Sequence, residues 1–473
     1  MSTSTSRGTA TTAAGTDARA LPRLETGNPH LDLILGGGFP GNSINIIMGE
    51  PGSGKTILAE RLVFQNARPG DRSILYLTTL SEPLDKVVRY LQQFSFFDEA
   101  LLGNPILYDS IGDALVEQGV SMLVPRLKEA ITRDKPKIIV IDSFKAIHDL
   151  GASLPEMRRT LYAMAGLLTA YETTAFLIGE YGAAEAAHYP EFAIADSIIE
   201  LARNKTGTRD ERYLRILKLR GSAYREGLHA FRVSPDGLEV FPRLVSPQLP
   251  PSYRLQVERV STGVDGLDRM LGGGLPQGRS TFLLGPTGSG KTTLALQFVL
   301  EGVRRGEKCL YVNFEENPSQ LAQQMASLGA NPEELAKKGL QVVYRSPVEL
   351  QIDSIISEVF RAVSERGVRR AVIDGVGDLL VAASDAQRLH DYLYALAQHF
   401  AARDALAIFT YETTQDGGGL WARLSALADN IIRLDVETDG KVRRTIRIVK
   451  ARGVDHKLDT GEDRITRAGV QVG

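Results

Sequence analysis

The sequence predicts two tandem α/β domains, each a mostly parallel β-sheet flanked by helices, and three observations lead to this fold class. A phosphate-binding loop pattern occurs twice, and its lysines, Lys55 and Lys291, are 236 residues apart (291 − 55), about half of the 473-residue chain. Both loops follow similar leaders, HLDLILGGGFPGN and GLDRMLGGGLPQG. Within each half, short apolar runs alternate with amphipathic helical stretches, as in sheets whose strands are joined by helices.

The apolar runs give the predicted strands. In the first half they are INIIMG, SILYLTT, KIIVIDS, TAFLIGE, SIIELAR and YLRILKLR. In the second half they are STFLLG, KCLYVNFEE, RAVIDG, LAIFTYE and NIIRLDV, the last paired with VRRTIRIVKAR across a turn at Thr438, Asp439 and Gly440.

Small polar residues and prolines mark the predicted domain boundaries. Residues 1–20 lack periodicity and are expected to form a disordered tail. Four prolines between Pro242 and Arg254 indicate a linker. We therefore place the first domain at 21–245, the linker at 246–254 and the second domain at 255–473.

Composition excludes several classes of protein. The formal net charge of −2 provides no general attraction to nucleic acid. The single cysteine, Cys309, excludes a disulfide framework and is expected to be buried. No apolar run approaches the roughly 18 residues that cross a membrane, and the N-terminus lacks a signal-peptide pattern. We therefore expect a cytoplasmic protein.

Each loop has the pattern that wraps a phosphate group. Its glycines let backbone N–H groups turn toward phosphate oxygens, its lysine reaches the β- and γ-phosphates, and its threonine hydroxyl is placed to ligate Mg²⁺. Each loop also lies between a predicted strand and a predicted helix. The expected nucleotide-binding residues are Gly49, Gly52, Ser53, Gly54, Lys55 and Thr56 in GEPGSGKT, and Gly285, Thr287, Gly288, Ser289, Gly290, Lys291 and Thr292 in GPTGSGKT.

Carboxylates follow other predicted strands. Asp142 and Asp374 end the runs KIIVID and RAVID and are expected to complete the Mg²⁺ site with Thr56 and Thr292, although such an aspartate can also be only a helix cap. Glu315 and Glu316, at the end of KCLYVNFEE, are candidates to orient and deprotonate the nucleophile. One should face the nucleotide and the other should be paired or solvated. A merely solvated strand end is the alternative.

Lys450 and Arg452 alternate on a predicted strand and so point to the same face. Cations of this kind often neutralise the γ-phosphate across a subunit boundary. A structural salt bridge is the other interpretation.

With these residues in place, the chain from about Leu21 to Gly473 resembles the KaiC-type ATPases of circadian clocks, which are tandem RecA-like proteins. The shared features are the doubled phosphate loop, the GGGLPQG leader, the FEENP segment and the K-x-R-G strand of each half. The resemblance implies ATP and Mg²⁺, bound between neighbouring subunits of a two-tiered homo-hexamer. The residues it implies are catalytic Glu315 and Glu316, the cations Lys450 and Arg452 that reach the adjacent subunit's nucleotide, and their first-half counterparts Lys218 and Arg220.

The first half departs from the family pattern. Leu80 and Ser81 stand where Glu315 and Glu316 stand in the second half, and Glu82 is one position too late to replace them on the same strand face. Loss of a general base typically lowers a rate by about 10²–10⁴. We therefore predict a first site that binds ATP, hydrolyses it poorly and mainly holds the ring together.

The C-terminal half departs from it as well. In the family two adjacent hydroxyl residues are autophosphorylated by the neighbour's ATP; Ser425 fills the first position, but Ala426 replaces the second. Serine kinase activity at Ser425 alone, or a buried or capping serine, are the alternatives. The chain also ends soon after ITRAGVQV, without the tail that binds an activating partner in clock members. We expect a clock-like signalling homologue with another output.

Two other functions remain open. A nucleic-acid motor or recombinase would need a basic or aromatic surface. The arginine pairs at 304–305, 369–370 and 443–444 are instead expected on solvated faces. A nucleotide-gated scaffold, whose state an unknown signalling partner reads, is compatible with the missing carboxylates of the first site.

Overall fold

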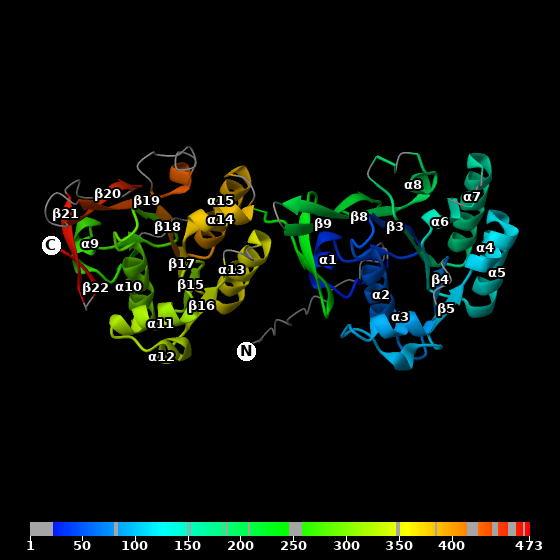
Figure 1. Cartoon of the computed structure of the whole chain (residues 1–473), viewed down its shortest axis with the longest axis horizontal. Coiled ribbons are helices and arrows are strands. Elements are labelled where there is room, and N and C mark those ends of the chain that lie inside the picture. Colours follow the sequence, from blue (N-terminus) through cyan, green and yellow to red (C-terminus); the bar gives the residue numbers. More distant parts are fainter. Residues whose placement is uncertain are drawn as a thin grey trace, which may run out of the picture. The chain divides into compact units, whose positions relative to one another are not determined.

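The computed structural model describes residues 22–79, 84–148, 150, 153–182, 184–185, 188–206, 209–245, 258–346, 351–383, 386–413, 424–437, 443–452, 460–466 and 469–473. The expected tail at 1–20, the linker at 246–254, the turn at 438–440, and Leu80, Ser81 and Glu82 lie outside these residues. The chain divides into two compact units, Met1–Pro242 and Arg243–Gly473, which share one architecture (Figure 1).

The first unit alternates strands and helices over most of its length. Its strands are β1 (Arg23–Leu24), β2 (Phe39–Pro40), β3 (Ile44–Gly49), β4 (Ile74–Thr78), β5 (Ile106–Ser110), β6 (Ile138–Asp142), β7 (Thr174–Gly179), β8 (Ser197–Thr206), β9 (Arg209–Leu219), β10 (His229–Ser234) and β11 (Gly237–Phe241). Its α-helices are α1 (Pro29–Ile34), α2 (Lys55–Asn66), α3 (Leu84–Leu91), α4 (Gly112–Gln118), α5 (Leu123–Asp134), α6 (Lys145–His148), α7 (Leu154–Ala170) and α8 (Glu191–Ile194).

The second unit follows the same plan. Its strands are β12 (Arg259–Val260), β13 (Leu275–Pro276), β14 (Ser280–Gly285), β15 (Cys309–Asn313), β16 (Leu340–Tyr344), β17 (Arg370–Asp374), β18 (Leu406–Glu412), β19 (Asn430–Glu437), β20 (Arg443–Ala451), β21 (Gly461–Thr466) and β22 (Gly469–Val472). Its helices are α9 (Asp265–Met270), α10 (Lys291–Arg304), α11 (Pro318–Ser327), α12 (Pro332–Lys337), α13 (Ile352–Arg366), α14 (Val376–Ala383) and α15 (Ala386–Ala401).

Within the described parts of the chain, each unit has a nine-stranded sheet. The strand orders β5-β4-β6-β7-β3-β8-β9-β10-β11 and β16-β15-β17-β18-β14-β19-β20-β21-β22 correspond strand for strand. In each order the first six strands are parallel and the last three are antiparallel to their neighbours. The predicted α/β fold class is therefore confirmed, and every apolar run predicted as a strand forms one.

Both faces of each sheet are buried, which explains why the parallel strands are continuously apolar. In the first unit α1, α2 and α3 pack on one face, and α4, α5 and α7 pack on the other. In the second unit α9 to α12 and α13 to α15 divide the two faces in the same way (Figure 1). Cys309 is buried in β15, as expected. No helix among the described residues has the length and apolar character of a membrane span.

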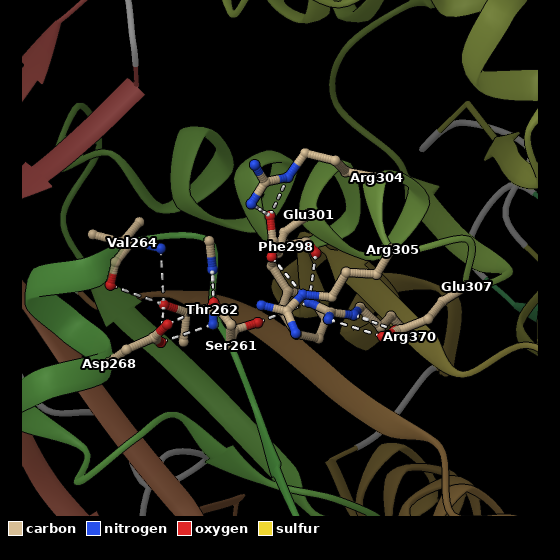
Figure 2. Close-up of polar contacts among 11 residues, drawn as sticks. Ser261, Thr262, Val264, Asp268, Phe298, Glu301, Arg304, Arg305, Glu307 and Arg370 are labelled. Carbon is tan, nitrogen blue, oxygen red and sulfur yellow. Dashed lines mark hydrogen bonds and ion pairs between the residues drawn. The ribbon is translucent and has the colours of Figure 1, made fainter.

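The expectation of solvated arginine pairs is wrong for Arg370. Its side chain is 1% exposed, because alternation along β17 turns Arg370 inward while Arg369 remains exposed. Figure 2 shows its guanidinium between Glu307, bonded through Nε at 2.5 Å, and the backbone carbonyl of Ser261, bonded through Nη1 at 2.8 Å. Gly302 provides the space, since a Cβ there would lie 2.5 Å from the Arg370 Cδ atom. The arginine thus ties β17 to the segment that leads into α9.

We expect Glu307→Gln to lower the free energy of unfolding of the second unit by about 1.5–3 kcal/mol, because it removes a charge-assisted bond from a buried guanidinium. Hydrogen exchange of α10 and β17, followed by mass spectrometry over a series of urea concentrations, measures this change in the second unit. Arg304→Gln is the matched control: the side chain of Arg304 is 78% exposed in its pair with Glu301, so its loss should cost under about 1 kcal/mol. Equal effects of the two changes would contradict the interpretation.

Candidate functional site

Both phosphate-binding loops lie between the central strand of a sheet and the next helix. The first loop joins β3 to α2, and the second joins β14 to α10. Gly54 (φ +102°) and Gly290 (φ +100°) directly precede these helices in the left-handed conformation that glycine adopts without strain. Gly285 is also required for space, because a Cβ there would lie 2.4 Å from the backbone oxygen of Leu434. The turn leaves the N-terminal N–H groups of each helix available to an anion.

The remaining loop residues occupy equivalent positions in both units. Gly52 and Gly288 have φ angles of +72° and +76°. Ser53 and Ser289 are fully buried, and their hydroxyl oxygens have no hydrogen-bond partner among the described residues. Gly49 packs against the backbone of β8 much as Gly285 packs against β19, and Thr287 is exposed and donates a hydrogen bond to Glu412. The two loops therefore share one geometry.

Each loop lysine folds back over its own loop. Lys55 Nζ donates to the backbone oxygen of Glu50 at 2.9 Å, and Lys291 Nζ donates to those of Gly285 and Pro286, each at 2.9 Å. Burial lowers the pKa of both lysines. Each ammonium group is thus held where the pattern places the β- and γ-phosphates.

In the first unit Asp142 meets the loop threonine directly. Its Oδ2 atom accepts hydrogen bonds from Thr56 Oγ1 at 2.9 Å and from the Tyr76 hydroxyl at 3.0 Å. Burial raises the pKa of Asp142, although both hydrogen bonds oppose the rise. The hydroxyl and the carboxylate expected to hold Mg²⁺ are thus brought together.

In the second unit Asp374 ends β17 and is 8% exposed. Its two carboxylate oxygens accept hydrogen bonds from Tyr311, at 2.5 Å, and from Thr410. Thr292 lies half-buried on the first turn of α10. The tyrosine that orients the aspartate is common to both units, since Tyr76 and Tyr311 hold matching positions on β4 and β15.

A cavity of about 840 Å³ adjoins the first loop and brings together residues that the sequence analysis missed. Besides Lys55 and Asp142, its walls include Glu180, Lys145 and Arg212. A signal for two of them was present in the repeat. Glu180 ends the run TAFLIGE, just as Glu412 ends LAIFTYE in the second half. Arg212 lies six residues before Lys218, and Arg444 lies six residues before Lys450.

A buried glutamate on α2 also lines this cavity. Glu60 is 1% exposed, and its Oε2 atom accepts a hydrogen bond from the Tyr108 hydroxyl at 2.6 Å. Burial raises its pKa to about 8, and the proximity of Asp142 adds to the rise. The rings of Tyr108 and Tyr76 stack with centroids 5.2 Å apart, and Tyr76 in turn holds Asp142. The first site therefore has a second carboxyl group, that of Glu60, which is linked to Asp142 through the two stacked tyrosines.

The adjacent glutamates after β15 have different surroundings. Asn313 shapes the turn that carries them: its Oδ1 atom accepts from the backbone N–H groups of Glu315, at 3.2 Å, and of Glu316, at 3.3 Å. Glu316 Oε1 accepts from Gln324, whereas Glu315 is exposed and its charge acts on Lys291. Burial raises the pKa of both glutamates. Glu316 is thus the glutamate that a hydrogen bond holds in place, and Glu315 is the one exposed to solvent.

Two more carboxylates of the second unit lie near Glu315 and were not predicted. After burial, the charge of Asp378 is the largest cause of the raised pKa of Glu315, and Glu412 adds to it. Asp378 Oδ2 is buried without a hydrogen-bond partner among the described residues. Glu412 ends β18 and Asp378 lies four residues after β17, at the same edge of the sheet as the loop, which is the signal that could have found them.

Lys450 and Arg452 lie at the other end of the sheet from their own loop. Lys450 Nζ donates to the backbone oxygen of Ser425 at 3.0 Å, and Arg452 lies 3.7 Å from Asp429. Asp429 accepts a hydrogen bond from the backbone N–H of Ser280, where β14 begins. Because β14 runs from Ser280 to the loop, these cations lie about 17 Å from the phosphate end of their own strand.

The first unit repeats this placement. Arg220 lies 3.3 Å from Asp196, which accepts a hydrogen bond from the backbone N–H of Ile44, the first residue of β3. Lys218 donates to the backbone oxygen of Phe192.

In the second unit, Ser425 is half-buried beside Lys450. The predicted interface cations and the predicted phosphosite are thus grouped away from the loop of their own unit.

Similar sequences occur among known proteins. The model of the KaiC ATPase family matches residues 24–245 and again residues 260–473. The chain is 27% identical over 470 residues to the circadian clock oscillator protein KaiC of Picosynechococcus sp., covering 96% of this chain and 90% of that protein. It is likewise 27% identical to proteins of that name from Parathermosynechococcus lividus, covering 96% and 86%, and from Nostoc sp., covering 97% and 90%.

The family model accounts for nearly all of both units, and its two matches coincide with the two sheets and their phosphate loops. The resemblance inferred from the motifs is thereby confirmed: the chain belongs to the KaiC ATPase family.

Proposed function

We propose that this chain is an Mg²⁺-dependent ATPase that hydrolyses ATP at the second site and retains it at the first. One observation carries the proposal: both units hold a loop lysine and a tyrosine-bound aspartate, but only the second has the glutamate pair after its matching strand. In the first unit those positions are Leu80 and Ser81. The first nucleotide then contributes binding energy to the assembly, and the second supplies turnover.

The residues present fit Mg²⁺. This ion is usually held by one or two carboxylates, a hydroxyl and the phosphates of the substrate, with water completing an octahedron. Thr56 and Asp142 already lie in contact, 2.9 Å apart, and the hydrogen bond from Tyr76 fixes the carboxylate. Thr292 and Asp374 are the corresponding pair in the second unit. Mg²⁺ held by these residues would neutralise part of the phosphate charge.

In the second site Glu315 would accept the proton of the attacking water or hydroxyl. Its pKa is raised by burial and by Asp378, Asp374 and Glu412, which makes it a stronger base than an ordinary glutamate. Glu316, paired with Gln324, would hold the turn in place. Lys291 and the loop N–H groups would stabilise the charge that develops on the phosphate.

We place Lys450 and Arg452 against the nucleotide of a neighbouring subunit. They lie at the end of the sheet opposite to their own loop, so a contact with their own nucleotide would require crossing the length of β14. A head-to-tail ring brings the two ends of successive subunits together. A homo-hexamer with ATP at each interface satisfies this requirement. The same geometry offers Ser425, beside Lys450, to the neighbour's γ-phosphate as a candidate for autophosphorylation.

The nucleic-acid motor is the weaker alternative. Arg370 is buried, and Arg304 and Arg305 both pair with Glu301, so these arginines do not form a free basic surface. A nucleotide-gated scaffold remains compatible with the proposal, because turnover at the second site can set the state that a signalling partner recognises.

ATP turnover of the wild-type chain, with particle mass measured by light scattering and phosphoprotein detected by mass spectrometry, tests the proposal. We expect turnover that requires Mg²⁺ and rises with the fraction of assembled ring. A monomer with full activity would refute the shared site. Stimulation by DNA that weakens with added salt would favour the motor instead.

A further inference from the structure

The first cavity has a cation that the second site lacks. Lys145 begins α6, three residues after Asp142, and lines the cavity together with Lys55 and Thr56. Asp142 and Asp374 end equivalent strands and accept equivalent tyrosine bonds. The position matching Lys145 is therefore Gly377, which has no side chain.

Contacts on both sides hold the Lys145 ammonium group at the cavity wall. Lys145 Nζ donates to the backbone oxygen of Glu180 at 2.7 Å and to Glu185 Oε2 at 3.1 Å. The amine lies 5.6 Å from the ring centroid of Tyr181 and 5.9 Å from that of Tyr189. Its side chain is 22% exposed, so the two rings and the cavity wall limit its movement.

The position of Glu180 relates Lys145 to the phosphate end of the cavity. Glu180 follows β7, the strand beside β3, and its charge acts on Lys55 more strongly than any other charge does. Its backbone oxygen is the acceptor nearest to Lys145 Nζ. Both ammonium groups are therefore arranged around one residue at the edge of the sheet where the loop binds phosphate.

We infer that Lys145 contacts the terminal phosphate of the nucleotide in the first cavity and makes this site prefer a triphosphate over a diphosphate. An ammonium group has three donors, and the contacts to Glu180 and Glu185 account for two of them. A γ-phosphate oxygen takes the third donor. Glu185, whose carboxylate is 47% exposed and also accepts a bond from the backbone N–H of Gly182 at 2.9 Å, competes with that oxygen for the ammonium group. The inference rests on the proposed binding of ATP at the first site.

The contrast with the second site gives this contact a role. At the second site the corresponding segment provides no cation, and Asp378 stands where the first has Ala146. There the γ-phosphate depends on cations from the neighbour. At the first site the chain's own Lys145 adds a contact to those of Lys55 and of Lys218 and Arg220 of the neighbouring subunit, so part of the preference for ATP is present before assembly.

The test uses the full chain carrying Lys291→Ala, so that nucleotide binding reports the first site. Affinities for methylanthraniloyl-ATP and methylanthraniloyl-ADP are measured with Mg²⁺ in this parent and after adding Lys145→Met, Lys145→Arg or Lys128→Met. Lys128 lies on the exposed side of α5 and is the matched surface control. We expect Lys145→Met to lower the ratio of ATP to ADP affinity about tenfold, Lys145→Arg to preserve it within about threefold, and Lys128→Met to leave it unchanged.

Glu185→Gln provides an independent variant with the opposite sign. Because it removes the competitor of the γ-phosphate, ATP affinity should rise about threefold while ADP affinity stays constant. An unchanged ratio in Lys145→Met, or an equal loss in Lys128→Met, overturns the inference and leaves the proposed function standing. Failure of the Lys291→Ala parent to bind either nucleotide overturns both.

Discussion

ATP turnover is expected to fall by roughly 10²–10⁴-fold when Glu315 and Glu316 are both replaced by glutamine. Glutamine has nearly the same shape and can still accept the bond from Gln324, and the bonds of Asn313 go to the backbone of the turn, but glutamine cannot accept the proton of the nucleophile. The loss should therefore appear in kcat, with nucleotide affinity nearly unchanged. Steady-state phosphate release and a single-turnover experiment separate the two quantities.

The single variants distinguish the two glutamates. Glu315 is exposed near Lys291, whereas Glu316 bonds Gln324 and shapes the turn. Glu315→Gln alone should therefore reproduce most of the loss, and Glu316→Gln should have the smaller effect. Turnover that survives the double replacement would place catalysis in the first unit and would contradict the role given to Leu80 and Ser81.

A mixing experiment tests whether the cations act on the neighbouring subunit. The Glu315→Gln/Glu316→Gln chain retains its cations, and a Lys450→Ala/Arg452→Ala chain retains its glutamates. Each alone should be nearly inactive. In an equal mixture, one half of the sites keep the glutamates and one half of their neighbours keep the cations, so about a quarter of the interfaces should recover. No recovery, in rings shown to be mixed, would assign the cations to their own subunit.

The fold could be predicted from the sequence because its central strands are buried on both faces. Continuous apolar runs such as those of β3, β6 and β14 are stable only in strands that helices cover on both faces of the sheet. The missed strands are those at or near the sheet edges. β5 has one buried residue and β16 has two, and β10 begins with a buried histidine, so their apolar patterns are weaker than those of the central strands.

The loops and aspartates of the site could be predicted because their residue types are dictated by short-range geometry. A glycine with positive φ before a helix, or an aspartate ending a strand, leaves a pattern in neighbouring residues. Lys145 and Arg370 leave none, because their surroundings come from distant segments. Two adjacent arginines suggested a solvated pair, and only the contacts with Glu307 and Ser261 show that Arg370 is buried.

Comparing the two halves of the sequence would have singled out Glu60, because the matching residue in the second half is apolar. It is the fifth residue after Lys55, and the fifth residue after Lys291 is Leu296, which is fully buried. Tyr108, the partner of Glu60, pairs with Tyr76, just as Val342 pairs with Tyr311 in the second unit. One unit thus has a carboxyl–phenol pair where the other has two aliphatic residues, so the buried acid is not required by the fold.

This difference predicts a contribution of Glu60 to the pH dependence of stability that has no counterpart at Leu296 in the second unit. The pKa of Glu60 is raised from 4.5 to about 8, so the folded unit holds a proton that the unfolded chain releases above about pH 5. Stability therefore falls as pH rises from about 5 to 8, because the unfolded state binds fewer protons in this interval. At 1.36 kcal/mol for each pH unit, the total loss is about 4 kcal/mol.

Glu60→Gln should remove this loss, since the amide stays neutral and still accepts the bond from Tyr108. Hydrogen exchange of α2, measured by mass spectrometry at pH values from 5.5 to 8.5 and corrected for the intrinsic rates, gives the local free energy of opening. The difference between wild type and Glu60→Gln cancels the titration of every other group. It should change by about 3 kcal/mol over this range, in favour of the variant at high pH. Glu60→Leu, which copies the second unit, should follow the profile of Glu60→Gln, whereas parallel profiles in wild type and both variants would mean that Glu60 is not the group that titrates.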